Sequence, residues 1–135
     1  MYYQGDKMTI ERLPDEPIVK VTLLAGFDFG DDMVEGNKPS FELLDSLDNP
    51  VFWILDMRQA KLGLEQLISS ASMMTRGERP LWKHPMIRQT VIVSNASMIQ
   101  LAAKGLNSDI FGNIAVKVFG TTEEAVDYAR SNTGA

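Results

Sequence analysis

The chain has 135 residues, of which 44% are hydrophobic and 23% are charged. This length and composition predict one ordinary globular domain over residues 1–135. The sequence has no cysteine, which excludes a disulfide, a thiolate nucleophile and a cysteine metal site. Its net charge of −5 argues against nucleic acid as a partner, because nucleic acids attract basic surfaces.

The first forty residues predict a hairpin followed by a loop. Residues 8–13 alternate between apolar and polar side chains and residues 18–24 form a second apolar run, with turn residues between them. We expect these two strands to pair antiparallel. Residues 25–40 are rich in glycine and acidic side chains and predict a loop. Its carboxylates lack the spacing of a calcium-binding loop, so no metal site is predicted.

The middle of the chain predicts a short helix and then a buried strand. Phe41, Leu44 and Leu47 have helical spacing, and Pro39 suits the first position of that helix. Residues 51–55, VFWIL, are continuously apolar, which is typical of a strand that is buried on both faces.

The rest of the chain alternates between helices and strands. An apolar stripe over residues 64–74 predicts a helix, residues 88–94 predict a strand, and a second stripe over residues 98–106 predicts another helix. Residues 114–119 predict the last strand. Thr121 stands three residues before Glu124, which is the spacing of a capping box at the start of a closing helix.

The predicted order is therefore β-β-α-β-α-β-α-β-α, with a core over about residues 8–131. This order predicts an α/β fold with a mixed, mostly parallel five-stranded sheet that begins with an N-terminal hairpin. Ligand sites in such sheets tend to lie beyond the carboxyl ends of the parallel strands. Asp56, Ser94 and Phe119 stand at those ends.

Three stretches carry a resemblance to the SpoIIAA-like, or STAS-like, family, which is named for an anti-sigma-factor antagonist. They are PVFWILDMRQAKLGLEQL, HPMIRQTVIVSNASM and AVKVFGTTEEAVDYA. The resemblance implies a small regulatory or protein-interaction domain without enzymatic activity. Members of that family place a phosphorylatable serine before a glycine at the start of a helix. Gly63 matches this glycine, but Lys61 and Leu62 replace the hydroxyl residues, so a phosphate switch is not expected there.

Asp56 is the first candidate site residue. Response regulators carry an acidic pair well before the aspartate that accepts the phosphoryl group, and a complete helix and strand separate that pair from the helix preceding the acceptor strand. This chain lacks that additional helix and strand, so a phospho-acceptor role is not expected. The alternative is that Asp56 accepts hydrogen bonds from its own loop, or pairs with Arg58 or Lys61.

The basic segment around Trp82 is the second candidate site. Arg79, Lys83 and His84 surround Trp82, and Arg76 and Arg88 flank them, in a chain of negative net charge. Such a segment suits an acidic partner or an anionic ligand, with Trp82 as an anchor or as part of a lid. The favoured interpretation is a solvated loop whose tryptophan covers the core. His84 is the only histidine, so a zinc site or a catalytic triad is not expected.

Met73 falls on the outward face of the helix expected over residues 64–75, which suggests a hydrophobic contact and a homodimer. The leading hypothesis is a non-enzymatic domain that binds a protein partner through this helix and the helix expected over residues 98–106. The alternative is a carrier or sensor of a small apolar or amphipathic anion, similar to Sec14-like lipid binding, with the head of the ligand near Arg79 or Lys83. No cofactor and no membrane span are expected, and the location is expected to be cytoplasmic.

Overall fold

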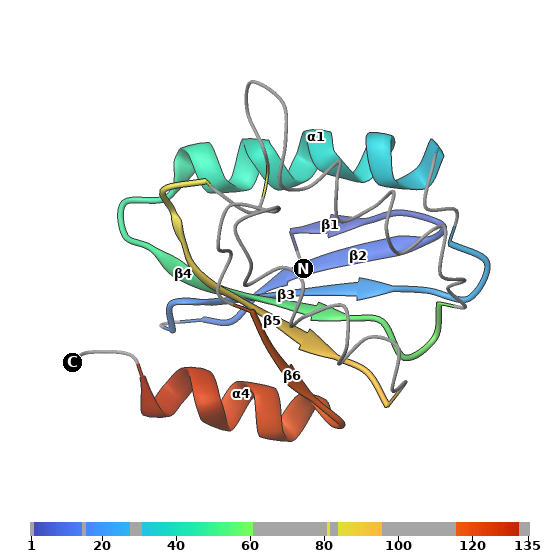
Figure 1. The fold of residues 1–135 in the computed structure, drawn as a ribbon. Coiled ribbons are helices and arrows are strands. Elements are labelled where there is room, and N and C mark those ends of the chain that lie inside the picture. The colour runs from blue at the N-terminus through green and yellow to red at the C-terminus, as the bar shows by residue number, and fades with distance from the viewer. Residues whose placement is uncertain are drawn as a thin grey trace, which may run out of the picture.

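The computed structural model describes residues 2–14, 16–27, 31–60, 81, 84–95 and 116–132. They form a six-stranded mixed sheet in the order β1-β2-β3-β4-β5-β6 (Figure 1). The strands are β1 (Tyr3–Gln4), β2 (Met8–Arg12), β3 (Ile18–Leu23), β4 (Val51–Asp56), β5 (Ile87–Val93) and β6 (Val116–Phe119). Two helices are described, α1 (Asp31–Ser46) and α4 (Thr122–Ser131).

The first three strands are antiparallel and the remaining pairings are parallel. β2 pairs with β3 as the predicted hairpin, with Ile10 opposite Val21. β3 pairs in parallel with β4, β4 with β5, and β5 with β6. The mixed α/β architecture and the N-terminal hairpin therefore agree with the sequence.

The predicted number of strands was wrong, because β1 adds a sixth strand before the hairpin. It pairs antiparallel with β2, and the half-buried Tyr3 packs against the core. The Gly5 N–H donates to the Met8 carbonyl at 2.9 Å and closes the turn between β1 and β2. The segment is too short and polar to show an apolar alternation in the sequence. It forms a strand because it pairs with β2.

The predicted loop over residues 25–40 was also wrong from Asp31 onward. α1 begins at Asp31 rather than near Phe41, and Pro39 lies inside it rather than at its first position. Tertiary contact explains part of the difference, because Gly36 lets the helix approach β2 so closely that a Cβ there would collide with the Met8 sulfur. Pro39 has no N–H to donate within the helix. Next to it, the Ser40 hydroxyl donates to the Gly36 carbonyl at 2.8 Å.

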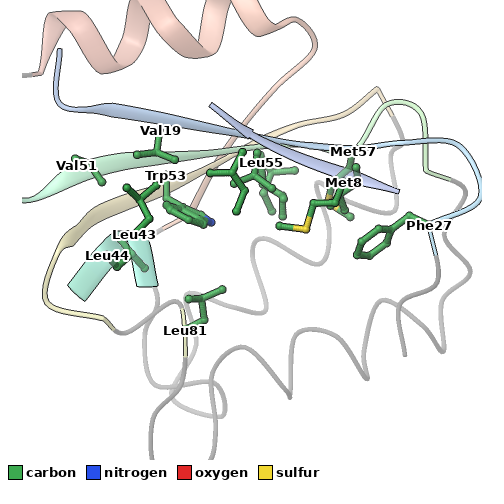
Figure 2. Close-up of a cluster of buried hydrophobic side chains, with 14 of the residues drawn as sticks. Met8, Val19, Phe27, Leu43, Leu44, Val51, Trp53, Leu55, Met57 and Leu81 are labelled. Atoms are coloured by element: carbon green, nitrogen blue, oxygen red, sulfur yellow. The ribbon is translucent and has the colours of Figure 1, made fainter. Parts of the chain in front are cut away.

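α1 and α4 lie on opposite faces of the sheet (Figure 1). The larger apolar cluster faces α1, and Figure 2 shows Trp53 and Leu55 of β4 directed into it. Its buried members are Met8, Ile10, Val19, Val21, Leu23, Phe27, Leu43, Leu44, Leu47, Val51, Trp53, Leu55, Met57, Ala60, Leu81 and Ile92.

The smaller cluster faces α4. It contains Ile18, Phe52, Ile54, Val91, Val93, Ala125 and Ala129. β4 supplies alternate residues to both clusters and all six of its residues are buried, which explains its continuously apolar sequence. The helices expected over residues 64–75 and 98–106 lie outside the described residues.

Candidate functional site

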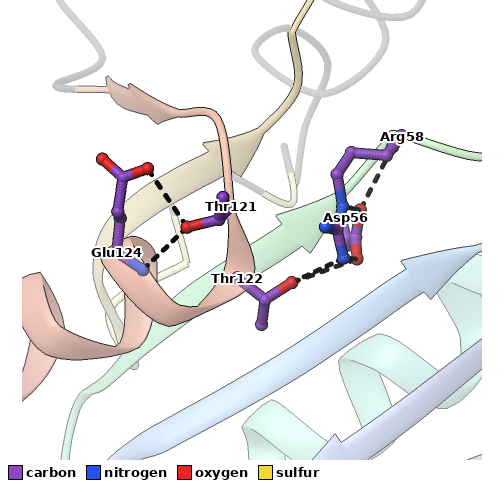
Figure 3. A network of polar contacts seen from close by, with 5 residues as sticks. All are labelled: Asp56, Arg58, Thr121, Thr122 and Glu124. Carbon is purple, nitrogen blue, oxygen red and sulfur yellow. Dashed lines mark hydrogen bonds and ion pairs between the residues drawn. The ribbon is translucent and has the colours of Figure 1, made fainter.

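The carboxyl edge of the parallel strands holds a polar cluster around Asp56 (Figure 3). Asp56 is the last residue of β4 and is opposite Val93 of β5, which in turn is opposite Phe119 of β6. α4 starts just after β6, and its first residue, Thr122, comes within hydrogen-bond distance of Asp56. The sheet thus brings together two side chains that are 66 positions apart in the sequence.

The Asp56 carboxylate accepts hydrogen bonds at both oxygens. Oδ1 accepts from the Arg58 backbone N–H at 3.1 Å and from Arg58 Nε at 3.0 Å. Oδ2 accepts from Arg58 Nη2 at 2.8 Å and from the Thr122 hydroxyl at 3.3 Å. Arg58 Nη2 also donates to Thr122 Oγ1 at 2.9 Å. We call these three residues the Asp56 clamp, since they join the end of β4 to the start of α4.

The clamp keeps the carboxylate ionised although it is buried. Burial alone would raise the pKa of Asp56, but the hydrogen bonds and charge of Arg58, helped by Thr122, outweigh it and hold the pKa below its ordinary value. The pKa of Arg58 is raised by the same pairing with Asp56. A carboxyl group with a lowered pKa is a poor general acid or base near neutral pH, because efficient proton transfer needs a pKa close to the working pH.

The sequence anticipated two of the clamp's members and missed the third. An interaction between Asp56 and Arg58 was one of the alternatives for this loop. Thr122 was missed as a partner, although the capping-box pattern placed it at the start of a helix. Thr121 caps that helix as predicted, because its hydroxyl accepts the Glu124 N–H at 3.2 Å. The Thr121 hydroxyl also donates to the Glu124 carboxylate at 3.1 Å, whereas in a full capping box that carboxylate accepts the backbone N–H of the cap residue.

Ser94 lies at the same edge, just beyond β5. It is buried, and its backbone N–H donates to the Phe119 carbonyl at 2.9 Å. Next to it, Asn95 Oδ1 lies 2.8 Å from the place that a Cβ on Gly120 would occupy. A larger residue at position 120 would therefore require the Asn95 side chain to move.

His84 lies at the opposite edge of the sheet. It precedes β5, and the Val51 N–H at the start of β4 donates to the neighbouring Met86 carbonyl at 2.7 Å. His84 Nδ1 accepts the Met86 N–H at 3.0 Å, so its ring proton is on Nε2, which is 2.9 Å from Asp45 Oδ1 of α1. The buried His84 ring thus connects α1 to the segment that precedes β5. It lies at the amino end of the parallel strands, and the length of β4 separates it from Asp56.

The other predicted site residues lie outside the described residues. They are Lys61, Gly63, Met73, Arg79, Trp82 and Lys83. Within the part of the chain that the structure describes, no group of three metal-ligating side chains comes together. No described helix is long and apolar enough to cross a membrane.

A small apolar cavity lies between α1 and the sheet. Its volume is about 30 Å³, and it is lined by residues that include Met8, Phe27, Trp53 and Leu81. That volume holds about one or two water molecules. Pockets for small-molecule ligands are typically about 300 to 1,000 Å³, so this cavity does not hold a lipid tail. The amphipathic carrier therefore gains no support from the described core.

A solved structure has the same architecture. The crystal structure of an uncharacterized protein from the DUF3478 family of Shewanella loihica PV-4, with a SpoIIAA-like fold, matches with a TM-score of 0.56 and 15% sequence identity. The match covers 96% of this chain and 98% of that one. No protein-family model matches the sequence, and no curated protein matches it.

The chain therefore has a SpoIIAA-like α/β fold, as the resemblance in the sequence predicted. At this level of identity the likeness concerns the fold alone.

Proposed function

We propose that this chain is a regulatory domain that works by binding a protein partner and performs no chemistry of its own. The fold supports the proposal, because the resemblance to anti-sigma-factor antagonists implies recognition of proteins. The replacement of the family's hydroxyl residues by Lys61 and Leu62 implies that phosphorylation at that turn does not control this binding.

The state of Asp56 is the observation that carries the proposal. This carboxylate lies at the edge where α/β sheets usually hold their ligands, and carboxylates at such sites in other proteins can act as bases or nucleophiles. Four donor contacts from Arg58 and Thr122 occupy its two oxygens, and its side chain is 3% exposed. A substrate would have to displace these contacts to reach it. The geometry favours a structural role for Asp56 over a catalytic one.

The proposal is tested by capturing and then reconstituting a complex. The full chain with a terminal affinity tag is used as bait in an extract of its own source cells, and heat-denatured bait serves as the control. Each polypeptide retained only by the folded bait is then purified and titrated against the chain by calorimetry. We expect at least one of them to bind saturably with a fixed stoichiometry.

Oligomerisation is measured in parallel by analytical ultracentrifugation over a range of concentrations. A second copy of the chain counts as a protein partner, and a dimer would satisfy the proposal. A chain that remains monomeric at every concentration, and whose candidate partners all fail to bind when purified, would contradict it.

A further inference from the structure

A wide groove lies at the amino edge of the parallel strands, at the end of β4 opposite to the Asp56 clamp. Its volume is about 1170 Å³. Its walls come from the β2–β3 turn, from the connection that precedes β4 and from the start of β5. Four prolines line it, namely Pro14, Pro17, Pro50 and Pro85. Proline fixes its own backbone torsion and has no N–H, so these walls are stiff and offer few donors.

Arg88 reaches this groove from a β-bulge. Val51 is opposite Ile87 and Phe52 is opposite Gln89, so Arg88 is an extra residue in β5 with no counterpart in β4. Bulges redirect side chains and often occur beside functional sites. The Arg88 guanidinium carbon lies 5.4 Å from the centroid of the Phe52 ring, a cation–π contact that holds the exposed head group in place.

Arg12, at the end of β2, is the second cation of the groove. Within the described ranges, neither Arg12 nor Arg88 has a carboxylate at ion-pair distance. Glu16 also lines the groove, but Arg130 of α4 neutralises it through bonds of 2.7 and 3.2 Å. Among the described lining residues, Asp48 is the remaining acid. Among the described lining residues, two arginines and one carboxylate are therefore without an ion pair, on a chain whose net charge is −5.

We propose that this groove binds an extended acidic segment of the partner protein, with Arg12 and Arg88 each pairing with a carboxylate. This inference rests on the proposed function and names the chemistry of the partner. Guanidinium groups bind carboxylates in a planar, two-bonded geometry, and an open channel suits a peptide better than it suits an enclosed small molecule. Two arginines beside Asp48 are too few for a phosphate backbone or an anionic membrane, each of which is held by many cations.

A labelled octaglutamate peptide is the probe, and fluorescence anisotropy with the full chain is the measurement. We expect saturable binding that weakens as salt is added, while octalysine and a glycine–serine peptide of the same length do not bind. Arg12→Gln and Arg88→Gln are each expected to weaken the binding by about tenfold, the usual effect of losing a charged hydrogen-bonded pair.

Two matched variants distinguish an effect of the groove on peptide binding from an effect of the net charge of the chain. Lys117→Gln removes one positive charge from an exposed position on β6, outside the groove, and is expected to change the affinity by less than about twofold. Asp48→Asn removes the acid that has no ion pair among the described lining residues, and it is expected to strengthen binding. Circular dichroism confirms that each variant is folded before its affinity is compared.

Several results would overturn this inference. One is the absence of saturable octaglutamate binding, and another is an equal loss of affinity in Arg88→Gln and Lys117→Gln. Inorganic phosphate that competes as well as the peptide would indicate a site for a single anion. Binding of an oligonucleotide or of anionic vesicles, but not of octaglutamate, would indicate a different class of partner. If a captured protein still binds while octaglutamate does not, the groove proposal fails and the proposed function stands.

Discussion

At the scale of single residues, Asp56 shows how a buried charge becomes part of the fold. Its carboxylate is compensated within two residues by Arg58 and across the sheet by Thr122. Arg58 keeps 41% of its side chain exposed, so water shares in stabilising the pair. Such a half-solvated pair avoids most of the desolvation cost of a fully buried ion pair.

Asp56→Asn is expected to lower the free energy of unfolding by about 1 to 3 kcal/mol at neutral pH, because an amide cannot replace a carboxylate that accepts charged hydrogen bonds. The measurement is chemical denaturation. Asp48→Asn makes the same chemical change on an exposed side chain that is not part of the clamp, and we expect it to alter stability by less than about 0.5 kcal/mol. If the two substitutions changed the free energy of unfolding equally, a structural role of Asp56 would be contradicted.

The pH dependence of stability tests the same clamp independently. Because the pKa of Asp56 is lower in the folded state, its stabilising effect is complete above its unfolded pKa of about 4. The effect is lost as the pH falls through the folded-state pKa. Denaturation curves of the chain and of Asp56→Asn are therefore expected to converge as the solution is acidified below about pH 4. A stability difference that stays constant down to strong acid would contradict this assignment.

Thr90 of β5 is a buried polar residue. It is 1% exposed, and within the described part of the chain its hydroxyl has no hydrogen-bond partner. Thr90→Val keeps the shape of the side chain and removes the hydroxyl, so we expect it to raise the free energy of unfolding by about 1 kcal/mol. Thr22→Val in β3, where the side chain is only half-buried, is the control and is expected to have a smaller effect. Destabilisation by Thr90→Val would show that the hydroxyl has a partner.

At the scale of elements, α1 departs furthest from the expectation raised by the sequence. Glycine, acidic residues and a proline in residues 25–40 are individually typical of loops. α1 nevertheless continues through Pro39, and its buried Leu43 and Leu44 pack on the sheet. Packing of an apolar face therefore outweighs the poor intrinsic helix propensity of the first half.

Pro39→Ala is expected to stabilise the chain by about 1 to 2 kcal/mol. Alanine restores an N–H that can donate to the Glu35 carbonyl, and the greater freedom of the unfolded chain offsets part of that gain. Denaturation measures the change, and Lys38→Ala on the same helix is the control for helix propensity alone. Destabilisation by Pro39→Ala would show that the proline ring contributes packing that outweighs the missing hydrogen bond.

At the scale of the whole molecule, the two apolar clusters depend on the same strands. β4 directs Trp53 toward α1 and Phe52 toward α4, so the same strand contributes to both apolar clusters. Loss of packing on one face therefore also disturbs the cluster on the other face. This sharing favours a single cooperative unfolding transition.

The cooperativity is measured with two probes. In a Trp82→Phe background, tryptophan fluorescence reports on the cluster beneath α1, and far-UV circular dichroism reports on the whole backbone. We expect the two denaturation curves to coincide. A fluorescence transition at lower denaturant concentration than the dichroism transition would mean that the face covered by α1 unfolds separately.

Local patterns in the sequence predicted the elements that depend on local physics. The alternation of β2 and β3, the apolar run of β4 and the Thr121 cap each appear within a few neighbouring residues. The same patterns led to the correct α/β class and to the expected position of Asp56 at a strand end. Pairing of Asp56 with Arg58 was also open to prediction, because the two residues are close in the sequence.

Only the tertiary structure decided the features that join distant segments. The pairing of β1, the extension of α1 through Pro39 and the contact of Thr122 with Asp56 all depend on surfaces that exist once the sheet has formed. The groove that brings Arg12 and Arg88 to one edge is of the same kind, because strand register and a bulge set it. The physical reason is that propensity and spacing act between near neighbours, whereas packing and long-range pairing gain their free energy only from the assembled chain.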